Sequence, residues 1–183
     1  MPRTPEANRR VRQATQNKIQ SAALRMFTQK GYHATSIEDV ARQAKVSKGL
    51  LYNYYKGKED LLAAMVQERI DEMTKVMESA AAYGTPYEQL CQIVHGALDY
   101  VRQHPDEYRF YLNLQTQPKD DRVLSAYSQQ LNEAAQKQFE VQCEIFAQLG
   151  VQDPRMRSLS FSSALNGAMM MIVTYPSGFP VDQ

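Results

Sequence analysis

The side chains from Ser47 to Lys58, in the run SKGLLYNYYKGK, combine hydrogen-bond donors, acceptors and aromatic rings at helical spacing. Ser47 has the type and place of a helix N-cap, and Val46 and Leu51 stand on either side of it at the spacing of a hydrophobic staple. Leu51 and Tyr55 lie one turn apart, which puts both on the inner side of the helix. The side chains left on the outer side are Lys48, Gly49, Leu50, Asn53 and Tyr54.

This outer set has the chemistry of a helix that reads DNA. Such a helix brings its N-terminal turn to the base edges, with side chains that donate, accept or stack. Lys48 suits a phosphate, Gly49 allows close approach of the backbone, and Asn53 can pair with an adenine edge. Leu50 offers an apolar contact, such as one to a thymine methyl group. A helix face that is merely solvated is the alternative, and three tyrosines in four positions argue against it: Tyr52, Tyr54 and Tyr55.

A second short helix must come before the DNA-reading helix and position it. Thr35 or Ser36 can cap this helix, with Glu38 or Asp39 three residues further on as the partner in a capping box. Its apolar residues recur at i, i+3, i+4 and i+7, and they are Ile37, Val40, Ala41 and Ala44. Two short helices joined by the tight turn at residues 45–47 predict a helix-turn-helix.

The rest of the chain also has helical patterns, and no stretch alternates in the way of a strand, so we predict an all-α fold. A flexible basic arm at residues 1–10 is expected to precede a first helix from about Val11 to Lys30, which Gly31 ends. Caps, prolines and apolar spacing predict the further helices, which lie at residues 58–79, 85–103, 105–114, 120–149 and 155–174.

Charge divides the chain into a basic part and an acidic part. Residues 1–58 hold twelve Lys and Arg against three acidic residues, whereas residues 59–183 hold nine against seventeen, for a net charge of +1. A basic head on an acidic body is typical of a protein that binds a polyanion.

The run from Thr35 to Leu61 resembles the DNA-binding domain of TetR-type (TetR/AcrR) bacterial transcriptional repressors. The shared pattern is SIEDVA, VSKGxLYxY[YF] and KxKExL, and it extends back to Gly31-Tyr32, Phe27 and Ala22–Leu24, about a third of the chain. Two positions depart from the family pattern: Leu50 is often a small hydroxyl residue there, and Tyr55 is usually Phe. The resemblance implies a homodimer that reads a palindromic operator in double-stranded DNA and releases it when a small-molecule inducer enters the C-terminal domain.

Together these patterns predict a sequence-specific transcriptional regulator of the repressor type. We expect a helix-turn-helix DNA-binding domain at residues 1–57, a connecting helix at 58–79, and a helical ligand-binding and dimerisation domain at 80–183. The expected DNA contacts are Thr35, Ser36, Ser47, Lys48, Gly49, Leu50, Tyr52, Asn53, Tyr54 and Lys58. In the resembling family the last two helices of each subunit form the dimer interface, but one clear helix, at residues 155–174, stands there in this chain. We therefore expect either a truncated sequence or an unusual interface, with the end of helix 120–149 as a further candidate.

The inducer site is expected among the inward faces of the helices after residue 80. The candidate side chains are Cys91, His95, Phe110, Tyr111, Tyr127, Asn166, Met169 and Met170. This mixture suits an apolar or aromatic compound held by one or two hydrogen bonds. The alternative for each of these residues is that it fills the core.

Other function classes fit the sequence less well. We found no catalytic pair, no CxxC and no glycine-rich phosphate loop, so we expect neither an enzyme on a helical bundle nor a cofactor or metal. Cys91 and His95 are four residues apart, a spacing compatible with binding a metal ion, but two ligands alone do not form a metal site. A helix-turn-helix protein without a small-molecule site, such as a nucleoid or recombination factor, remains the main alternative, and a purely structural helical module conflicts with the basic head.

Two further features bear on location. The two cysteines lie far apart, which fits a reduced compartment, and the start of the chain lacks the apolar core of a signal peptide. The most apolar stretch, residues 164–173, includes Asn166 and is much shorter than a membrane span. We therefore expect a cytoplasmic protein without membrane contact.

Overall fold

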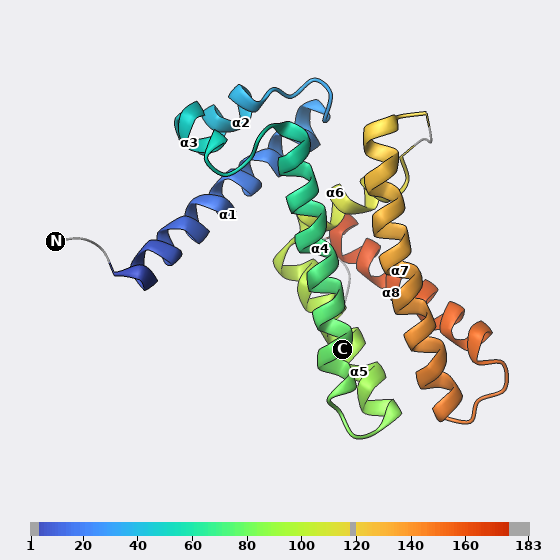
Figure 1. Cartoon of the computed structure of the whole chain (residues 1–183). Helices are drawn as coiled ribbons and strands as arrows, with labels where there is room; N and C mark the ends of the chain where they lie inside the picture. Colours follow the sequence, from blue (N-terminus) through green and yellow to red (C-terminus); the bar gives the residue numbers. More distant parts are fainter. Residues whose placement is uncertain (1–3, 118–119, 176–183) are drawn as a thin grey trace. The chain divides into compact units, whose positions relative to one another are not determined.

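The computed structural model describes residues 4–117 and 120–175, and every regular element in these ranges is an α-helix (Figure 1). The helices are α1 (Pro5–Lys30), α2 (Ile37–Ala44), α3 (Lys48–Tyr52), α4 (Lys58–Ala81), α5 (Pro86–Gln103), α6 (Pro105–Gln115), α7 (Arg122–Gln148) and α8 (Pro154–Thr174). The predicted all-α fold is confirmed. The chain divides into two compact units, and the division falls inside α4, between Gln67 and Glu68.

The beginning of α1 corrects one prediction. We expected a flexible arm at residues 1–10, but α1 begins at Pro5; residues 1–3 lie outside the described part. The Thr4 hydroxyl accepts a hydrogen bond from the Ala7 N–H at 3.2 Å, and proline at the first helical position needs no N–H partner. Glu6 also pairs with Arg10 at 2.7 Å, one turn further on.

The first unit is organised around a core to which α1, α2, α3 and the start of α4 each contribute. The apolar stripe predicted for α2 is buried, and Leu51 of α3 is fully inaccessible to solvent. Burying an aliphatic side chain of this size stabilises a fold by about 1.5–3 kcal/mol. The fully buried apolar side chains of this unit are Ile19, Ala22, Ala23, Val40, Leu51, Leu61, Leu62 and Val66.

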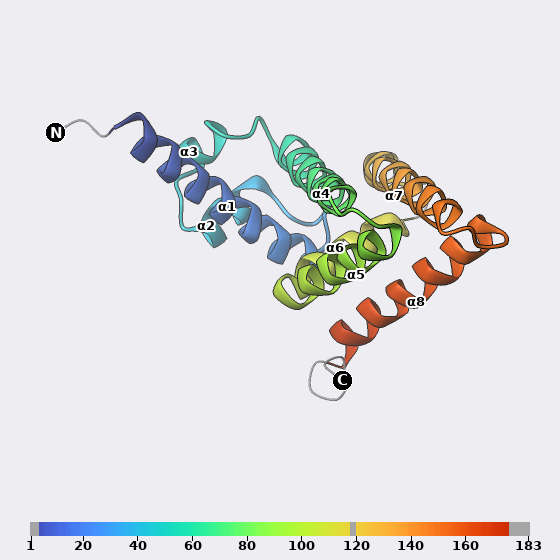
Figure 2. The ribbon, with the colours of Figure 1, turned by 90° about the horizontal axis from the view of Figure 1, so that it is seen from below.

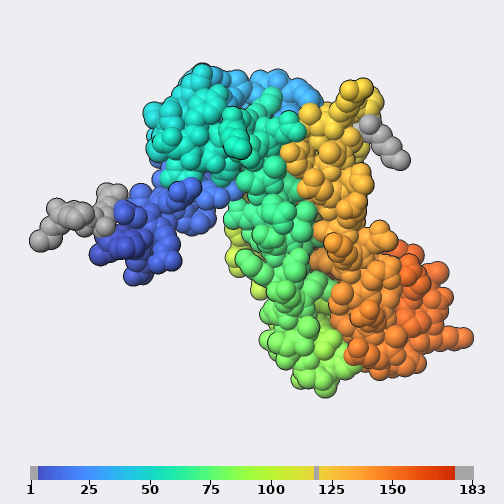
Figure 3. All heavy atoms as spheres, in the orientation of Figure 1, coloured from blue at the N-terminus to red at the C-terminus, as the bar shows by residue number. Residues whose placement is uncertain are grey.

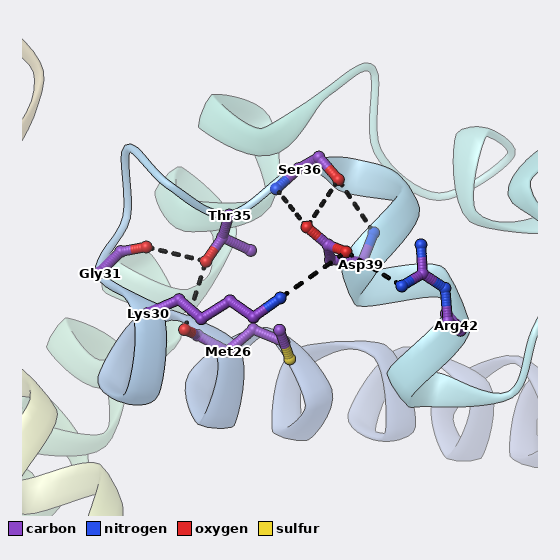
Figure 4. Close-up of polar contacts among 7 residues, drawn as sticks. All are labelled: Met26, Lys30, Gly31, Thr35, Ser36, Asp39 and Arg42. Atoms are coloured by element: carbon purple, nitrogen blue, oxygen red, sulfur yellow. Dashed lines mark hydrogen bonds and ion pairs between the residues drawn. The ribbon is translucent and has the colours of Figure 1, made fainter.

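Hydroxyl groups of two successive residues lie between α1 and α2, one bonded to the end of α1 and the other to the start of α2 (Figure 4). Thr35 is 1% exposed, and its hydroxyl lies 2.8 Å from the Gly31 carbonyl oxygen and 3.2 Å from that of Met26, where α1 ends. Ser36 caps α2 instead: its hydroxyl accepts from the Asp39 N–H at 3.1 Å, and the Asp39 carboxylate accepts from the Ser36 N–H at 3.2 Å. From the sequence, either Thr35 or Ser36 could cap α2, and in the structure the cap is Ser36.

We expect Thr35→Val to destabilise the protein by about 1–3 kcal/mol, because it keeps the volume but removes the buried hydroxyl that donates to the partly buried Gly31 carbonyl group. Urea denaturation followed by circular dichroism measures this change. The matched control is Thr35→Ser, which keeps the hydroxyl and loses one methyl group. A valine variant as stable as the wild type, or less affected than the serine variant, would contradict this role.

The second unit contains α4 from Glu68 onward and all of α5 to α8. Viewed as in Figure 2, α5, α7 and this part of α4 are seen nearly end-on, and α8 runs across them. Two buried clusters hold the helices together; one contains Ala80, Leu90, Ile93 and Ile145, and the other contains Val101, Tyr108, Met169 and Val173. On the side turned to the viewer in Figure 3, α7 forms much of the surface of this unit.

Within residues 4–117 and 120–175, none of the helices combines the length and the apolar character needed to span a lipid bilayer.

Candidate DNA interface and ligand cavity

The short helix α3 and the residue after it expose four of the five outer residues that the sequence indicated: Lys48, Gly49, Leu50 and Asn53. The Ser47 hydroxyl accepts from the Leu50 N–H at 3.1 Å, which fixes the first turn. Leu51 is fully buried and Tyr55 is 4% exposed, so the predicted inner side is confirmed. The exposed residues around the helix are Ser47, Lys48, Gly49, Leu50, Tyr52 and Asn53.

Lys48 is held in place by groups of its own unit. Its ammonium group pairs with the Glu38 carboxylate of α2 and lies 5.8 Å from the centroid of the Tyr52 ring. The hydrogen bond from Lys48 keeps the pKa of Glu38 below its usual range. Because the pair is exposed, a DNA phosphate can replace the carboxylate at little cost.

Tyr54 and Arg12 form a contact that sequence reasoning missed. Tyr54 is half-buried rather than outward, and the Arg12 guanidinium lies 5.5 Å from the centroid of its ring. Arg12 therefore belongs to the surface around α3 although it lies on α1. The start signal Thr4-Pro5-Glu6 could have shown that the basic N-terminal residues are on a helix.

Two of the predicted DNA contacts have structural roles. Thr35 is buried, and its hydroxyl bonds to the end of α1. The prediction that its side chain contacts DNA is therefore wrong, because it is a core group. The Lys58 ammonium donates to the carbonyl oxygens of Tyr32 at 2.8 Å and His33 at 3.3 Å. It also lies 4.4 Å from the centroid of the Tyr32 ring. The predicted phosphate contact of Lys58 would have to use its third donor.

A cavity of about 770 Å³ lies within the second unit, lined by residues of α4 to α8. Four predicted ligand residues line it: Tyr111, Asn166, Met169 and Met170. The other four are not among the lining residues. Of these, Cys91 is half-buried and His95 is exposed, whereas Phe110 and Tyr127 are buried in the unit.

The walls of the cavity are mainly apolar, and some of their polar side chains are hydrogen-bonded within the unit. The Gln138 side chain donates to the Met73 carbonyl oxygen at 3.1 Å, and the Gln142 side-chain oxygen accepts from the Ser162 hydroxyl at 2.6 Å. These bonds use polar groups that a ligand would otherwise have to satisfy. The arrangement suits a mainly apolar molecule.

Arg69, which the sequence analysis did not select, carries a largely buried charge in the wall of this cavity. Its side chain is 16% exposed, and its guanidinium lies 3.8 Å from the centroid of the Tyr100 ring on α5. It also pairs with Glu72 at 3.5 Å. Burial raises the pKa values of Tyr100 and Tyr111, so both hydroxyl groups stay protonated.

Among the described residues, no group of three or more His, Cys, Asp or Glu side chains is placed to hold a metal ion.

The fold and the exposed face of α3 define a helix-turn-helix protein with a second helical unit, and comparisons with known proteins show which regulators its DNA-binding domain resembles. Residues 19–65 match the family model described as bacterial regulatory proteins, tetR family. The chain is 35% identical over 79 residues to the HTH-type transcriptional regulator HbdR of Aromatoleum sp. (strain CIB), covering 43% of this chain and 34% of that one. The TetR-type DNA-binding domain that the sequence pattern predicted is confirmed for residues 19–65.

Solved structures extend the likeness in fold to the second unit. A TetR-like transcriptional regulator from Rhodococcus sp. RHA1 has a TM-score of 0.72 at 23% identity, over 87% of this chain and 84% of that chain. The transcriptional regulator FadR from Bacillus subtilis, solved in complex with stearoyl-CoA, has a TM-score of 0.64 at 19% identity, over 88% of this chain and 89% of that chain. In sequence, however, the chain spans about half the length, or less, of the relatives it matches.

Proposed function

We propose that this protein is a dimeric transcriptional regulator that binds operator DNA through α2 and α3 and releases it when a small apolar molecule occupies the cavity. The observation that carries the proposal is the division of α3, which buries Leu51 and leaves Lys48, Gly49 and Asn53 exposed on one surface. The excess of positive charge in residues 1–58 supports binding to a polyanion. A protein with this role in a bacterium acts in the cytoplasm, where the DNA is.

The proposed dimer interface is the exposed apolar side of α8 together with the end of α7. Groups of large apolar side chains exposed on a surface often mark a site of protein–protein interaction. On α8 they are Met156, Leu159, Met170 and Met171, which are 56%, 52%, 54% and 39% exposed, and on α7 Val141 is 37% exposed. Pairing of α8 with its copy would cover them and relate the two DNA-binding units by a two-fold axis.

The cavity supports the response to a small molecule. Its volume of about 770 Å³ lies in the range of ligand sites in proteins, about 300–1,000 Å³. FadR, a similar fold, was solved with an apolar-chain ligand, stearoyl-CoA. This cavity favours a ligand-responsive regulator over the alternative, a helix-turn-helix protein without a small-molecule site.

Helix α4 is the element through which a ligand would act. Its residues up to Gln67 belong to the first unit, and Arg69, Met73 and Met77 further along the same helix line the cavity. A ligand that binds one position of this helix more tightly than another shifts the population of the DNA-binding state. The proposed effect is a change in the spacing of the two α3 helices of the dimer.

Selection from random double-stranded DNA tests the proposal. We expect an enriched inverted repeat with half-site centres about one helical turn apart, roughly 34 Å, because a two-fold dimer places its two helices in successive major grooves. Sedimentation of the free protein at micromolar concentration should give a dimer. A monomer in solution, or selection that enriches no inverted repeat, would refute the dimeric operator-binding function.

A further inference from the structure

One end of the cavity concentrates the groups that could hold a polar head group. We call it the Arg69 end, formed by Arg69 of α4, Tyr100 of α5 and Tyr111 of α6, which all line the cavity. The Arg69 guanidinium is mostly buried and stacks on the Tyr100 ring at 3.8 Å. A charged group in such surroundings is favourable mainly when it is paired.

The pairing of Arg69 leaves hydrogen-bonding capacity unused. A guanidinium has five N–H donors in a rigid fork. Among the described residues, Glu72 is the one carboxylate that forms an ion pair with it, through a single contact of 3.5 Å. This contact is longer than the roughly 2.7–2.9 Å of a strong charged hydrogen bond, and it is not the parallel two-bond pairing that an arginine can make with a carboxylate.

The Tyr100 hydroxyl points to the same need for a ligand. It is buried and interacts with the Glu107 side chain, but within the described part of the chain no hydrogen bond of normal geometry satisfies it. Most buried polar groups in proteins have a partner, so an exception in a cavity wall marks a place where a ligand atom would fit. Because burial raises the pKa of Tyr100, its hydroxyl is a donor and would meet an acceptor oxygen.

The acidic neighbours of the Arg69 end do not exclude an anion. Glu72 is partly exposed and can turn to solvent when another carboxylate replaces it. Burial raises the pKa of Glu107, and this carboxyl group lies 3.6 Å from the His104 ring nitrogen, so it has a partner other than Arg69.

The cavity becomes apolar away from Arg69. Along α4 the wall continues with Met73, Val76 and Met77, and Ile93, Phe139 and Leu165 face it from other helices. From Arg69 to Met77 the helix rises about 12 Å, at 1.5 Å per residue. A polar end and an apolar wall of this length suit a chain molecule with one polar head group.

We propose that the Arg69 end binds the carboxylate of a ligand whose aliphatic chain lies along the apolar walls of the cavity. Two N–H groups of Arg69 bind the two carboxylate oxygens, and the Tyr100 hydroxyl donates to one of them. Glu72 releases Arg69 as the ligand binds. This assignment rests on the proposed function, in which the cavity is the ligand site.

Three probes with the same chain and different head groups test the assignment: dodecanoate, 1-dodecanol and dodecylamine. Calorimetric titration of the full-length protein should show dodecanoate binding at least about tenfold more tightly than the other two, because a charged hydrogen-bonded pair is lost with them. Arg69→Met should remove this preference and leave the affinity for dodecanol unchanged. Tyr100→Phe should weaken dodecanoate binding severalfold, and Arg69→Lys should weaken it less than Arg69→Met does.

Lys75→Met is the matched control, because Lys75 is another cation of the cavity wall but is not stacked on Tyr100. It should leave the preference for dodecanoate intact, and circular dichroism checks that each variant is folded. Equal binding of the three probes, tighter binding of the amine, or a preference that survives in Arg69→Met would overturn the carboxylate assignment and leave the cavity as a ligand site. Binding of none of the probes would overturn both.

Discussion

Replacing Asn53 with alanine is expected to weaken binding to the operator far more than binding to random DNA. A side-chain amide that pairs with an adenine edge contributes about 1–3 kcal/mol of discrimination. The proposed dimer carries two such helices, so the loss should be about 2–6 kcal/mol, or roughly thirtyfold to twenty-thousandfold in affinity. Fluorescence anisotropy with a selected operator and a scrambled duplex, at one fixed salt concentration, measures the two affinities.

The structure makes Asn53 suitable for this substitution. It is exposed at the end of α3, with φ −72° and ψ −16°, a conformation that alanine adopts readily. Its backbone N–H donates to the carbonyl oxygens of Gly49 and Leu50, and alanine keeps this donor. A loss of specificity would therefore report the side chain and not the fold of the helix.

Lys48→Met provides the comparison for Asn53→Ala. Lysine contacts phosphate groups, which are the same in every sequence, so its removal should weaken operator and scrambled DNA by similar factors. The slope of log affinity against log salt should also fall by about one for each lysine removed. If Asn53→Ala behaved like Lys48→Met and weakened both duplexes equally, Asn53 would not be a base-reading residue.

The helices around α3 could be predicted because their signals are local. Ser36 and Ser47 each lie three residues before the N–H group that they accept from, and the apolar stripe of α2 repeats at helical spacing. Tyr55 and Leu51 turn inward for the same reason. The prediction of a flexible N-terminal arm was wrong, although the signal for a helix there was also local. The basic composition of residues 1–10 indicated an arm, whereas the cap at Thr4 starts a helix.

The roles of side chains that depend on distant partners could not be predicted in this way. The Lys58 ammonium binds carbonyl groups 26 and 25 residues earlier in the chain, so nothing beside it in sequence shows this contact. Arg69 on α4 contacts Tyr100 on α5, so the two partners belong to different helices. His95 was expected in the ligand site, but the packing of α5 buries Ile93 and Val101 and leaves His95 exposed.

A response to ligand requires a difference in free energy between two states of the protein. A hundredfold change in operator affinity corresponds to about 2.7 kcal/mol of coupling between ligand and DNA. A charged hydrogen bond or a few apolar contacts contribute a free energy of this size if they form in one position of α4 and are absent in the other. Molecules that fill the cavity equally well in both states would bind without releasing DNA.

Ala135→Trp is expected to abolish release by an inducer while operator binding persists. Ala135 lies on α7, half-buried, and lines the cavity, so an indole ring there takes up the space of a ligand. Met169 is a less suitable position, because it is 7% exposed and packs in a buried cluster that a larger side chain would disturb. The measurement is the release of labelled operator by a compound that releases the wild-type protein at saturating concentration.

His95→Trp is the matched control for this experiment. It adds the same indole ring at an exposed position of α5 that does not line the cavity, so it should respond to the compound like the wild type. The chain has no tryptophan of its own, so each variant carries a single tryptophan. If the compound still binds, its addition should quench or shift the tryptophan fluorescence more in Ala135→Trp, where the ring lies in the cavity wall, than in His95→Trp. If Ala135→Trp released DNA normally, the inducer would bind elsewhere; if both variants failed to respond, the loss could not be assigned to the cavity.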